Sequence, residues 1–151
     1  MSAEDANEED VNCPFCQIDK EKTRVIEERE RVVVVLSNPR LLPGHTLVIP
    51  RRHVEKPSEM TPEERMDVFD TLFEYQNKIV EQYSTGCDIR QNYRPFLAQS
   101  WVKVNHVHFH LLPRELEDEL YERSMKFEKE MWTALPEEER EKFTQLLRLQ
   151  T

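Results

Sequence analysis

The chain lacks long apolar runs and an excess of positive charge. No stretch approaches the roughly 20 apolar residues with which a helix crosses a bilayer, and residues 1–10 are acidic and polar, unlike a signal peptide. The 21 Lys and Arg against 30 Asp and Glu give a formal net charge of −9, which argues against a surface that binds nucleic acid. We therefore expect a soluble, cytoplasmic protein that binds neither membranes nor nucleic acids.

Cysteine is also scarce: there are three in all, and two of them, Cys13 and Cys16, are three positions apart. An odd number at this spacing indicates a metal-binding pair or a redox pair rather than a disulfide framework. Two inert thiols are the third reading. A redox pair belongs at the start of a helix that follows a strand, and only an acidic segment precedes Cys13. A closed zinc site would need two further ligands from elsewhere in the chain.

The 151 residues suggest one domain of ordinary size. Residues 1–11 are charged with almost no apolar content, so they are predicted to form a disordered acidic tail. Beyond them, β-branched runs such as Val32–Val35 favour a sheet. Strands are predicted at residues 24–26, 31–36, 45–49, 87–93 and 104–112.

The clearest helix signal begins at Thr61, which forms a capping box with Glu64, and Pro62 suits the first helical position. Apolar residues then recur at helical spacing until Gly86 ends the pattern. The predicted face is mostly apolar and consists of Met66, Phe69, Leu72, Phe73, Gln76, Ile79, Val80 and Tyr83. Two further helices are predicted, at residues 115–132 and 136–149. Together these elements predict an α+β domain, with an antiparallel sheet of about five strands, one long central helix and appended C-terminal helices.

The segment His106–Leu111 alternates histidine with an apolar residue. On a strand, successive side chains point to opposite faces, so this segment would bury Val107, Phe109 and Leu111 and display three imidazoles in a row. Three readings compete: a polar outer face that is rich in histidine, a metal centre, and nucleophilic catalysis by a neutral imidazole. The spacing alone does not choose between the last two.

The segment His106–Leu112 matches the His-φ-His-φ-His-φ-φ signature, in which φ is apolar, of the histidine triad superfamily of nucleotide hydrolases and transferases. Pro43–His53 and Cys13–Cys16 also resemble segments of that family, in order and approximate distance. The resemblance implies a histidine triad catalytic domain over residues 12–114. It leaves residues 115–151 as a helical extension, which we expect to pack on the domain or on a dimer. It also implies a homodimer formed through the long helix and an edge strand.

The resemblance further implies a nucleotidyl hydrolase or transferase that acts on nucleoside phosphoramidates or dinucleoside polyphosphates. His108 would attack the α-phosphorus and form a covalent nucleotidyl-histidine, which water then resolves. His110 would donate a hydrogen bond to a non-bridging phosphate oxygen, where charge builds in the transition state. The imidazoles on either side of His108 would lower its pKa and keep it neutral and nucleophilic.

A zinc site follows from the same resemblance. In the zinc-binding members of the family, the ligands that join the cysteine pair correspond to His53 and His106. The implied site is closed and structural, and its ligands are Cys13, Cys16, His53 and His106. His106 would then serve the metal and reach the chemistry only indirectly. His45, which begins a strand after Pro-Gly, is read as a satisfied core histidine.

Two departures from the family pattern bear on the substrate. Where the family has Gly-Gln-Ser or Gly-Gln-Thr before the triad, this chain has Trp101-Val102-Lys103, with Gln99-Ser100 further upstream. Lys103 has two readings, a point charge that binds phosphate and a solvated lysine at a strand end. Where the family has an acidic or amide residue that hydrogen-bonds the ribose hydroxyls, the chain has Ser37, with Asn38 beside it. A serine is a poorer acceptor for the two hydroxyls than a carboxylate. The candidate substrate-binding residues are Ser37, Asn38, Asn92, Gln99, Ser100 and Lys103.

Two rival functions stay open at this point. One is a metal-dependent hydrolase in which the triad itself binds a catalytic zinc. The other is a nucleotide-binding or scaffold protein that has the fold and little turnover. The altered phosphate segment favours this second rival, and the complete triad argues against it.

Overall fold

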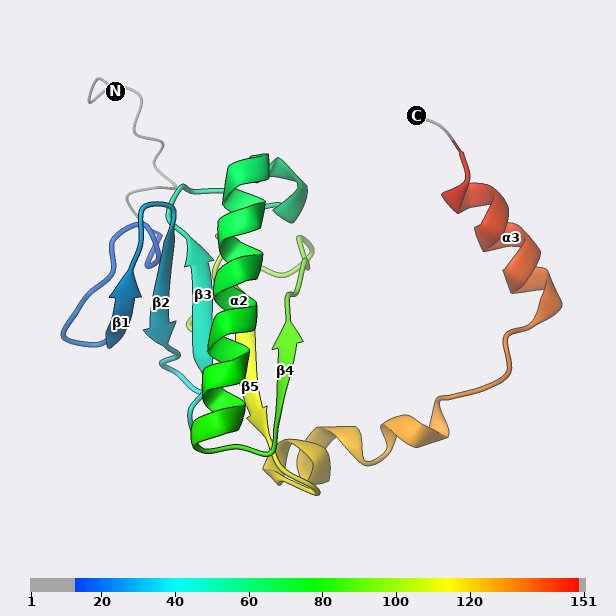
Figure 1. Ribbon diagram of the computed structural model, residues 1–151. Coiled ribbons are helices and arrows are strands. Elements are labelled where there is room, and N and C mark those ends of the chain that lie inside the picture. The colour runs from blue at the N-terminus through cyan, green and yellow to red at the C-terminus, as the bar shows by residue number, and fades with distance from the viewer. Residues whose placement is uncertain (1–12, 150–151) are drawn as a thin grey trace. The chain divides into compact units, whose positions relative to one another are not determined.

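The computed structural model describes residues 13–149 (Figure 1). The chain divides into two compact units, of which the first ends at Asp118 and the second begins at Glu119. No helix within residues 13–149 is long and apolar enough to span a membrane. The sheet, the long helix and all of the candidate site residues belong to the first unit.

The first unit is built on a five-stranded sheet in which all neighbouring strands are antiparallel. Its spatial order is β1-β2-β3-β5-β4, so β5 lies between β3 and β4. The strands are β1 (Val25–Glu28), β2 (Val32–Leu36), β3 (Thr46–Pro50), β4 (Gly86–Arg90) and β5 (Phe109–Arg114). The predicted α+β class and antiparallel sheet are therefore confirmed.

The valine run of β2 is buried because both faces of the sheet are covered. Val32 and Val34 pack in the core cluster that includes residues of helix α2 (Pro62–Gln82). Val33 and Val35 pack on the opposite face with Leu47 of β3 and with Phe15 of the N-terminal segment. A strand covered on both faces has a continuous apolar run instead of an alternation. This second face, opposite α2, carries the functional side chains described below.

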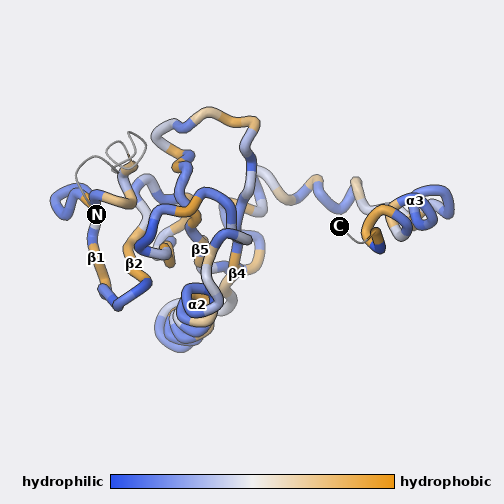
Figure 2. The backbone as a smooth tube through the Cα atoms, turned by 90° about the horizontal axis from the view of Figure 1, so that it is seen from above, coloured by the Kyte–Doolittle hydropathy of each residue, from blue (hydrophilic) through white to orange (hydrophobic). Residues whose placement is uncertain are grey.

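Helix α2 begins at the predicted capping box and lies along one face of the sheet (Figures 1 and 2). Thr61 Oγ1 accepts from the Glu64 N–H at 3.1 Å, and Glu64 Oε1 accepts from the Thr61 N–H at 2.9 Å. Leu72 and Ile79 are buried, as predicted. Five other residues of the predicted apolar face are exposed: Met66, Phe69, Phe73, Val80 and Tyr83. The helix carries more apolar residues than the stripe that the sheet covers, so spacing alone did not locate its buried side.

The strand that carries the triad is shorter than predicted. β5 begins at Phe109 rather than at residue 104, so His106 and His108 precede the strand. The backbone before Phe109 follows the segment after β3 instead, where the Val107 N–H donates to the Val54 carbonyl O at 2.7 Å. Val107 and Phe109 are still buried in the core that includes α2 residues, as the predicted alternation requires.

β4 also ends early, at Arg90 rather than at residue 93. Arg90 pairs with His110, and the chain of β5 leaves the sheet just before Phe109, so β4 has little further strand to pair with. Four candidate residues consequently lie on the connection between β4 and β5: Asn92, Gln99, Ser100 and Lys103.

The predicted helix over residues 115–132 is wrong. A π-helical turn, η3 (Tyr121–Met125), and a 3-10 turn, η4 (Glu128–Glu130), take its place. Glu117 has a φ of 54°, which is outside the right-handed helical region. Of the apolar residues in this segment, Leu120 is buried, whereas Leu116, Phe127 and Met131 are exposed. The segment therefore lacks the continuous buried face that would support one long helix.

The remaining helices are short. The predicted helix over residues 136–149 is confirmed as α3 (Glu137–Leu147), and a 3-10 turn, η2 (Pro57–Glu59), precedes α2. The packing of residues 115–151 on the domain or on a dimer stays a prediction. The predicted disordered tail, residues 1–11, lies outside the described residues.

Candidate active site and metal centre

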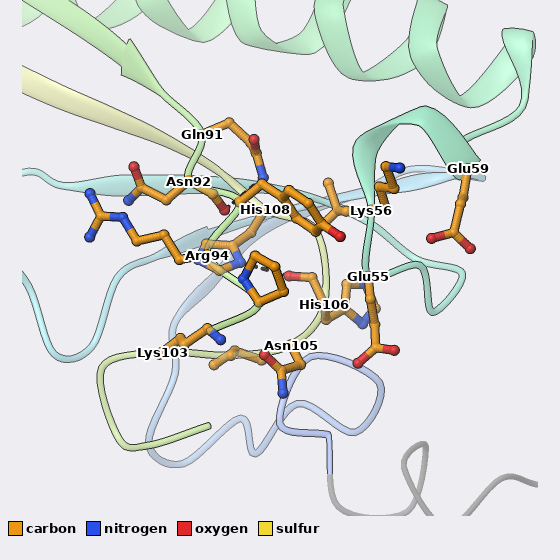
Figure 3. Close-up of a pocket in the computed structure, with 14 residues that line it drawn as sticks. Glu55, Lys56, Glu59, Gln91, Asn92, Arg94, Lys103, Asn105, His106 and His108 are labelled. Atoms are coloured by element: carbon orange, nitrogen blue, oxygen red, sulfur yellow. Dashed lines mark hydrogen bonds between the residues drawn. The ribbon is translucent and has the colours of Figure 1, made fainter. Parts of the chain in front are cut away.

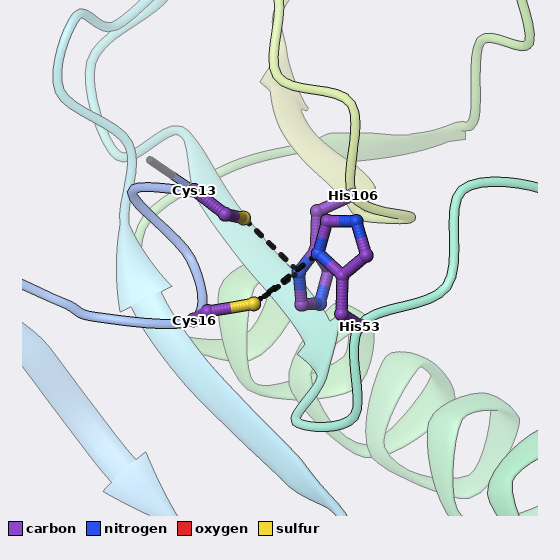
Figure 4. A group of neighbouring side chains, drawn as sticks. All are labelled: Cys13, Cys16, His53 and His106. Carbon is purple, nitrogen blue, oxygen red and sulfur yellow. Dashed lines mark hydrogen bonds between the residues drawn. The ribbon is translucent and has the colours of Figure 1, made fainter. Parts of the chain in front are cut away.

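Four side chains that are distant in the sequence meet beside the N-terminal segment (Figure 4). They are Cys13, Cys16, His53 and His106, and their ligand atoms all lie within 4.8 Å of one another. The Nδ1 atom of His106 is 3.3 Å from Cys13 Sγ and 3.5 Å from Cys16 Sγ. Cys16 Sγ is 3.2 Å from His53 Nδ1. These are the four residues that the family resemblance implied as zinc ligands.

The donor set and its spacing fit a tetrahedral zinc ion. Zinc binds thiolate sulfur at about 2.3 Å and imidazole nitrogen at about 2.0 Å, so neighbouring ligand atoms lie about 3.3–3.8 Å apart. The three sulfur–nitrogen distances, 3.2, 3.3 and 3.5 Å, are close to the edges of such a tetrahedron. Four protein ligands leave no open coordination position, which is typical of a structural site.

The other ring nitrogen of His106 orients it towards the two cysteines. Its Nε2 lies 2.7 Å from the carbonyl O of Pro50, the last residue of β3. A carbonyl only accepts, so Nε2 carries the proton and the lone pair of Nδ1 faces the sulfur atoms. The His106 ring is also almost fully buried, which fits a metal ligand better than a group that attacks substrate.

His108 is in the chemical state that a nucleophile needs. Its Nδ1 lies 2.7 Å from the His106 carbonyl O, so the neutral ring carries its proton on Nδ1 and has a lone pair on Nε2. Burial lowers the pKa of His108, which keeps the ring neutral near pH 7. The neutral state was predicted from the neighbouring imidazoles, but burial is its cause, and the hydrogen bond to His106 acts in the opposite direction.

A chain of hydrogen bonds fixes the tautomer of His110. The Leu41 N–H donates to His45 Nδ1 at 3.0 Å, so the proton of neutral His45 is on Nε2. His45 Nε2 donates to His110 Nδ1 at 2.8 Å, which leaves the His110 proton on Nε2 as a free donor. Burial, together with the nearby His108 and the charge of Arg90, lowers the pKa of His45 to about 4 and that of His110 to about 3. Both rings are therefore neutral at pH 7, as the chain of donors requires.

A cleft of about 590 Å³ surrounds His108 and His110. Its floor is a row of cross-strand neighbours: Val35 pairs with Leu47, Leu47 pairs with His110, and His110 pairs with Arg90. Paired residues of adjacent strands share one face of a sheet. The floor thus changes from apolar side chains on β2 and β3 to a histidine on β5 and a cation on β4.

The cleft is positively charged, although the whole chain has a net charge of −9. No carboxylate of the described residues lines it, and its cationic side chains are Arg40, Arg90, Arg94 and Lys103. Within residues 13–149, Arg90 and Arg94 have no carboxylate partner, whereas arginines elsewhere, such as Arg29 and Arg114, are ion-paired. Unpaired cations without carboxylates form a suitable site for an anion such as phosphate.

A second cavity, of about 290 Å³, also borders His108 (Figure 3). It includes the carboxylates of Glu55 and Glu59, so it is mixed in charge and suits phosphate less well. Four of its polar residues also line the larger cleft: Asn92, Arg94, Lys103 and His108.

The larger cleft brings together five of the six candidate substrate-binding residues, namely Ser37, Asn38, Asn92, Ser100 and Lys103. Ser37 Oγ donates to the Pro39 carbonyl O at 2.7 Å, so its own lone pairs are left to accept from a ribose hydroxyl. Gln99 lines neither of the two cavities. Its Oε1 accepts from the Asn105 N–H at 3.2 Å, so Gln99 braces the loop between β4 and β5.

Sequence reasoning missed two contributors to the site. His45 is a buried, satisfied histidine as expected, but its partner is His110, and no sequence pattern links residues 65 positions apart. Phe15 packs edge-on against His108, with ring centroids 5.0 Å apart, and lines the larger cleft. The available signal for Phe15 was its place between the two cysteines, because a metal knuckle would fix the residues between its ligands.

Known proteins resemble the chain in sequence and in fold. The family model "HIT domain" matches residues 19–117. An uncharacterized HIT-like protein of Methanocaldococcus jannaschii is 34% identical over 105 residues, which cover 68% of this chain and 78% of that protein. The bis(5′-nucleosyl)-tetraphosphatase (asymmetrical) of Schizosaccharomyces pombe is 33% identical over 81 residues, 52% of this chain and 42% of that protein. A Zn-bound histidine triad family protein from Mycobacterium smegmatis has a TM-score of 0.60 at 26% identity, covering 74% of this chain and 81% of that one. The chain therefore belongs to the histidine triad (HIT) family.

Proposed function

We propose that the protein is a nucleotidyl hydrolase or transferase that cleaves nucleoside phosphoramidates or dinucleoside polyphosphates through a covalent intermediate on His108. The observation that carries the proposal is a neutral His108, protonated on Nδ1, in a cationic cleft that no carboxylate of the described residues lines. Such a cleft attracts a phosphate, and a neutral imidazole is able to attack its phosphorus. The resemblance to the Schizosaccharomyces pombe bis(5′-nucleosyl)-tetraphosphatase supports this substrate class.

In the proposed first step, His108 Nε2 attacks the α-phosphorus. A nitrogen–phosphorus bond forms, and the bond to the leaving amine or phosphate breaks, with its electron pair departing on the leaving group. A leaving amine takes up a proton from solvent as it departs. The Nε2–H of His110 and the guanidinium of Arg90 stabilise the charge that builds on the non-bridging oxygens. As His108 becomes cationic, its Nδ1–H bond to the His106 carbonyl becomes charge-assisted and stronger.

In the second step, water attacks the phosphorus of the nucleotidyl-histidine. The nitrogen–phosphorus bond breaks and its electron pair returns to His108 as neutral imidazole. One proton of the water stays on the phosphate of the released nucleoside monophosphate, and the other passes to solvent. We assign the ribose contacts to Ser37 and Asn38 and the phosphate contacts to Asn92, Ser100 and Lys103, all of which line the cleft.

We further propose that Cys13, Cys16, His53 and His106 bind a structural zinc ion. The close approach of their ligand atoms supports this, with three sulfur–nitrogen distances near those of a zinc tetrahedron, as does the Zn-bound relative from Mycobacterium smegmatis. When bound, zinc supplies a rigid link between the N-terminal segment and the residue two positions before the nucleophile.

The directions of the triad rings argue against a catalytic zinc held by the triad itself. His106 Nδ1 lies against the cysteine sulfurs, whereas His108 Nδ1 donates to a carbonyl. His110 Nδ1 accepts from His45, so the three rings have three separate sets of partners.

The homodimer through α2 and an edge strand, and the cytoplasmic location, stay predictions. The exposed side chains of Phe69 and Phe73 on α2 support the homodimer, because a partner would cover them.

The proposed function is tested by incubating the zinc-loaded protein with adenosine and guanosine phosphoramidates and dinucleoside polyphosphates. We expect the wild-type protein to release mononucleotide from at least one of them. His108→Ala should keep its fold and zinc and release none. If folded, zinc-loaded wild-type protein releases mononucleotide from no compound, the nucleotide-binding or scaffold function replaces the enzymatic one.

A further inference from the structure

The connection between β4 and β5 carries a tryptophan that the proposed reaction does not use. Trp101 lines the larger cleft, and its side chain is 78% exposed. Leu97 and Val102 are exposed as well and line the same cleft. A large indole that is exposed beside a cleft is suited to bind the flat apolar part of a ligand.

A short turn positions Trp101. The Ser100 N–H donates to the Lys103 carbonyl O at 2.9 Å, which places Trp101 and Val102 at the corner of the turn. Ser100 Oγ accepts from the N–H groups of Val102 and Lys103, at 3.3 Å and 3.2 Å. The ammonium of Lys103 donates to the Leu97 carbonyl O. These bonds preorganise the backbone that carries the indole, so less entropy is lost when a ligand binds.

The floor of the same cleft provides an apolar strip beside the catalytic histidines. Val35 and Leu47 are cross-strand neighbours, and Leu47 is also the neighbour of His110. Adjacent strands are about 4.8 Å apart, so an apolar ring on this strip lies within a few ångströms of a phosphate at His110. Phe15 and Ile18 extend the strip, since both pack on the same face of the sheet and line the cleft.

We propose that Trp101 stacks on the base of the nucleotide bound at His108. This inference rests on the proposed function, because it needs a nucleotide at that position. Stacking on an aromatic ring strengthens the binding of a base by about tenfold. The gain in affinity is similar for different bases, because each base has a π face. Trp101 would therefore contribute affinity and little discrimination between adenine and guanine.

The test is a binding titration of the zinc-loaded full chain. The chain has two tryptophans, so Trp132→Phe leaves Trp101 as the fluorescent reporter. AMP is the probe, and ribose 5-phosphate, which has no base, is its matched control. We expect AMP to change the emission of Trp101 at saturation and ribose 5-phosphate to leave it unchanged.

Calorimetry on the Trp101 variants supplies the second measurement. We expect Trp101→Ala to raise the Kd for AMP about tenfold and to leave the Kd for ribose 5-phosphate unchanged, while Trp101→Phe recovers part of the loss. An unchanged Kd for AMP in Trp101→Ala, or no binding of AMP by the wild-type protein, would overturn the inference. Mononucleotide release is measured separately, so failed turnover with AMP bound at Trp101 would refute only the proposed reaction.

Discussion

His45 donates a hydrogen bond from Nε2 to Nδ1 of His110 at 2.8 Å. The direction of this bond is set on the other side of the His45 ring, where the Leu41 N–H donates to Nδ1 at 3.0 Å. A backbone N–H only donates, so the order of protons along the chain is fixed. His45 therefore fixes the tautomer of His110 in which Nε2 carries the proton, so His110 is able to donate a hydrogen bond to a ligand in the cleft.

Removing His45 should therefore lower turnover, although His45 acts through His110 and has no direct role in the proposed reaction. We expect His45→Ala to reduce kcat by about a hundredfold, the loss typical of one misplaced oxyanion donor, with a smaller effect on KM. His45→Gln is the matched variant, because its amide is able to accept from Leu41 and donate to His110. Steady-state kinetics checks this, and wild-type kcat in a folded His45→Ala protein would refute the positioning role.

The cysteines offer a matched pair for the zinc site. Cys16→Ser should lose stoichiometric zinc and unfold at a lower temperature, since the bound metal contributes to folding stability. Cys87→Ser should keep the bound zinc and the unfolding temperature, because Cys87 is outside the cluster. Burial also raises the pKa of the Cys87 thiol to about 11, so it does not form the thiolate that binds a metal. Metal analysis and thermal unfolding measure the two effects. Full zinc occupancy in Cys16→Ser would exclude the proposed ligand set.

An ion pair beside a proposed ligand should tune zinc affinity. Arg52, the residue before His53, binds the buried carboxylate of Glu64 through Nη2–Oε1 at 2.8 Å and through Nε at 3.2 and 3.3 Å. Glu64→Gln removes the charge while keeping a residue that completes the capping box. We expect zinc affinity to fall about tenfold, because Arg52 fixes the backbone next to His53, and groups that orient metal ligands contribute at least that much to affinity.

Competition with a chelator measures this affinity. Asp67→Asn is the control, because it breaks the more exposed pair between Asp67 and Arg31 on the same helix. Equal zinc affinities in Glu64→Gln, Asp67→Asn and the wild-type protein would show that the Arg52–Glu64 pair does not position His53.

Stability should fall in acid because of His45 and His110. Their pKa values decrease from an ordinary 6.5 to about 4 and about 3 in the fold. Below pH 6.5 the two imidazoles bind protons in the unfolded chain but stay neutral in the folded protein. The free energy of unfolding therefore decreases as the pH falls towards these values. The contribution of the neutral His45 and His110 to the free energy of unfolding is thus complete above pH 6.5 and is lost progressively below it.

Urea unfolding of the wild-type protein and of His110→Asn checks this prediction between neutral and acidic pH. The variant lacks one of the two imidazoles, so its stability should decrease less on acidification. The proposed zinc ligands are the same in both proteins, so their protonation cancels in the difference. If the free energy of unfolding depends on pH in the same way in both proteins, the role assigned to His110 is contradicted.

The sequence predicted those features that local signals specify. The capping box of Thr61 and Glu64 needs only neighbouring residues, and the β-branched valine run of β2 favours a strand. The grouping of Cys13, Cys16, His53 and His106 followed from the family resemblance, and the structure brings their ligand atoms together.

Features that depend on tertiary contacts were not predictable in the same way. β5 starts late because the Val107 N–H bonds to Val54, a contact that no local pattern encodes. The bond between His45 and His110 joins the residue before β3 to β5, and these two strands become neighbours only in the folded sheet. The exposed side of α2 also carries large apolar residues, so the apolar pattern alone does not fix which side of the helix the sheet covers.

The central claim is the covalent bond to His108, and the most direct test is the intact mass of protein quenched during turnover of a dinucleoside polyphosphate. The proposed mechanism predicts wild-type protein heavier by one nucleotidyl group, with the added mass on the peptide that contains His108. His108→Ala should show neither the added mass nor turnover. Turnover by the wild-type protein with the group on another residue, or turnover by His108→Ala, would contradict the mechanism.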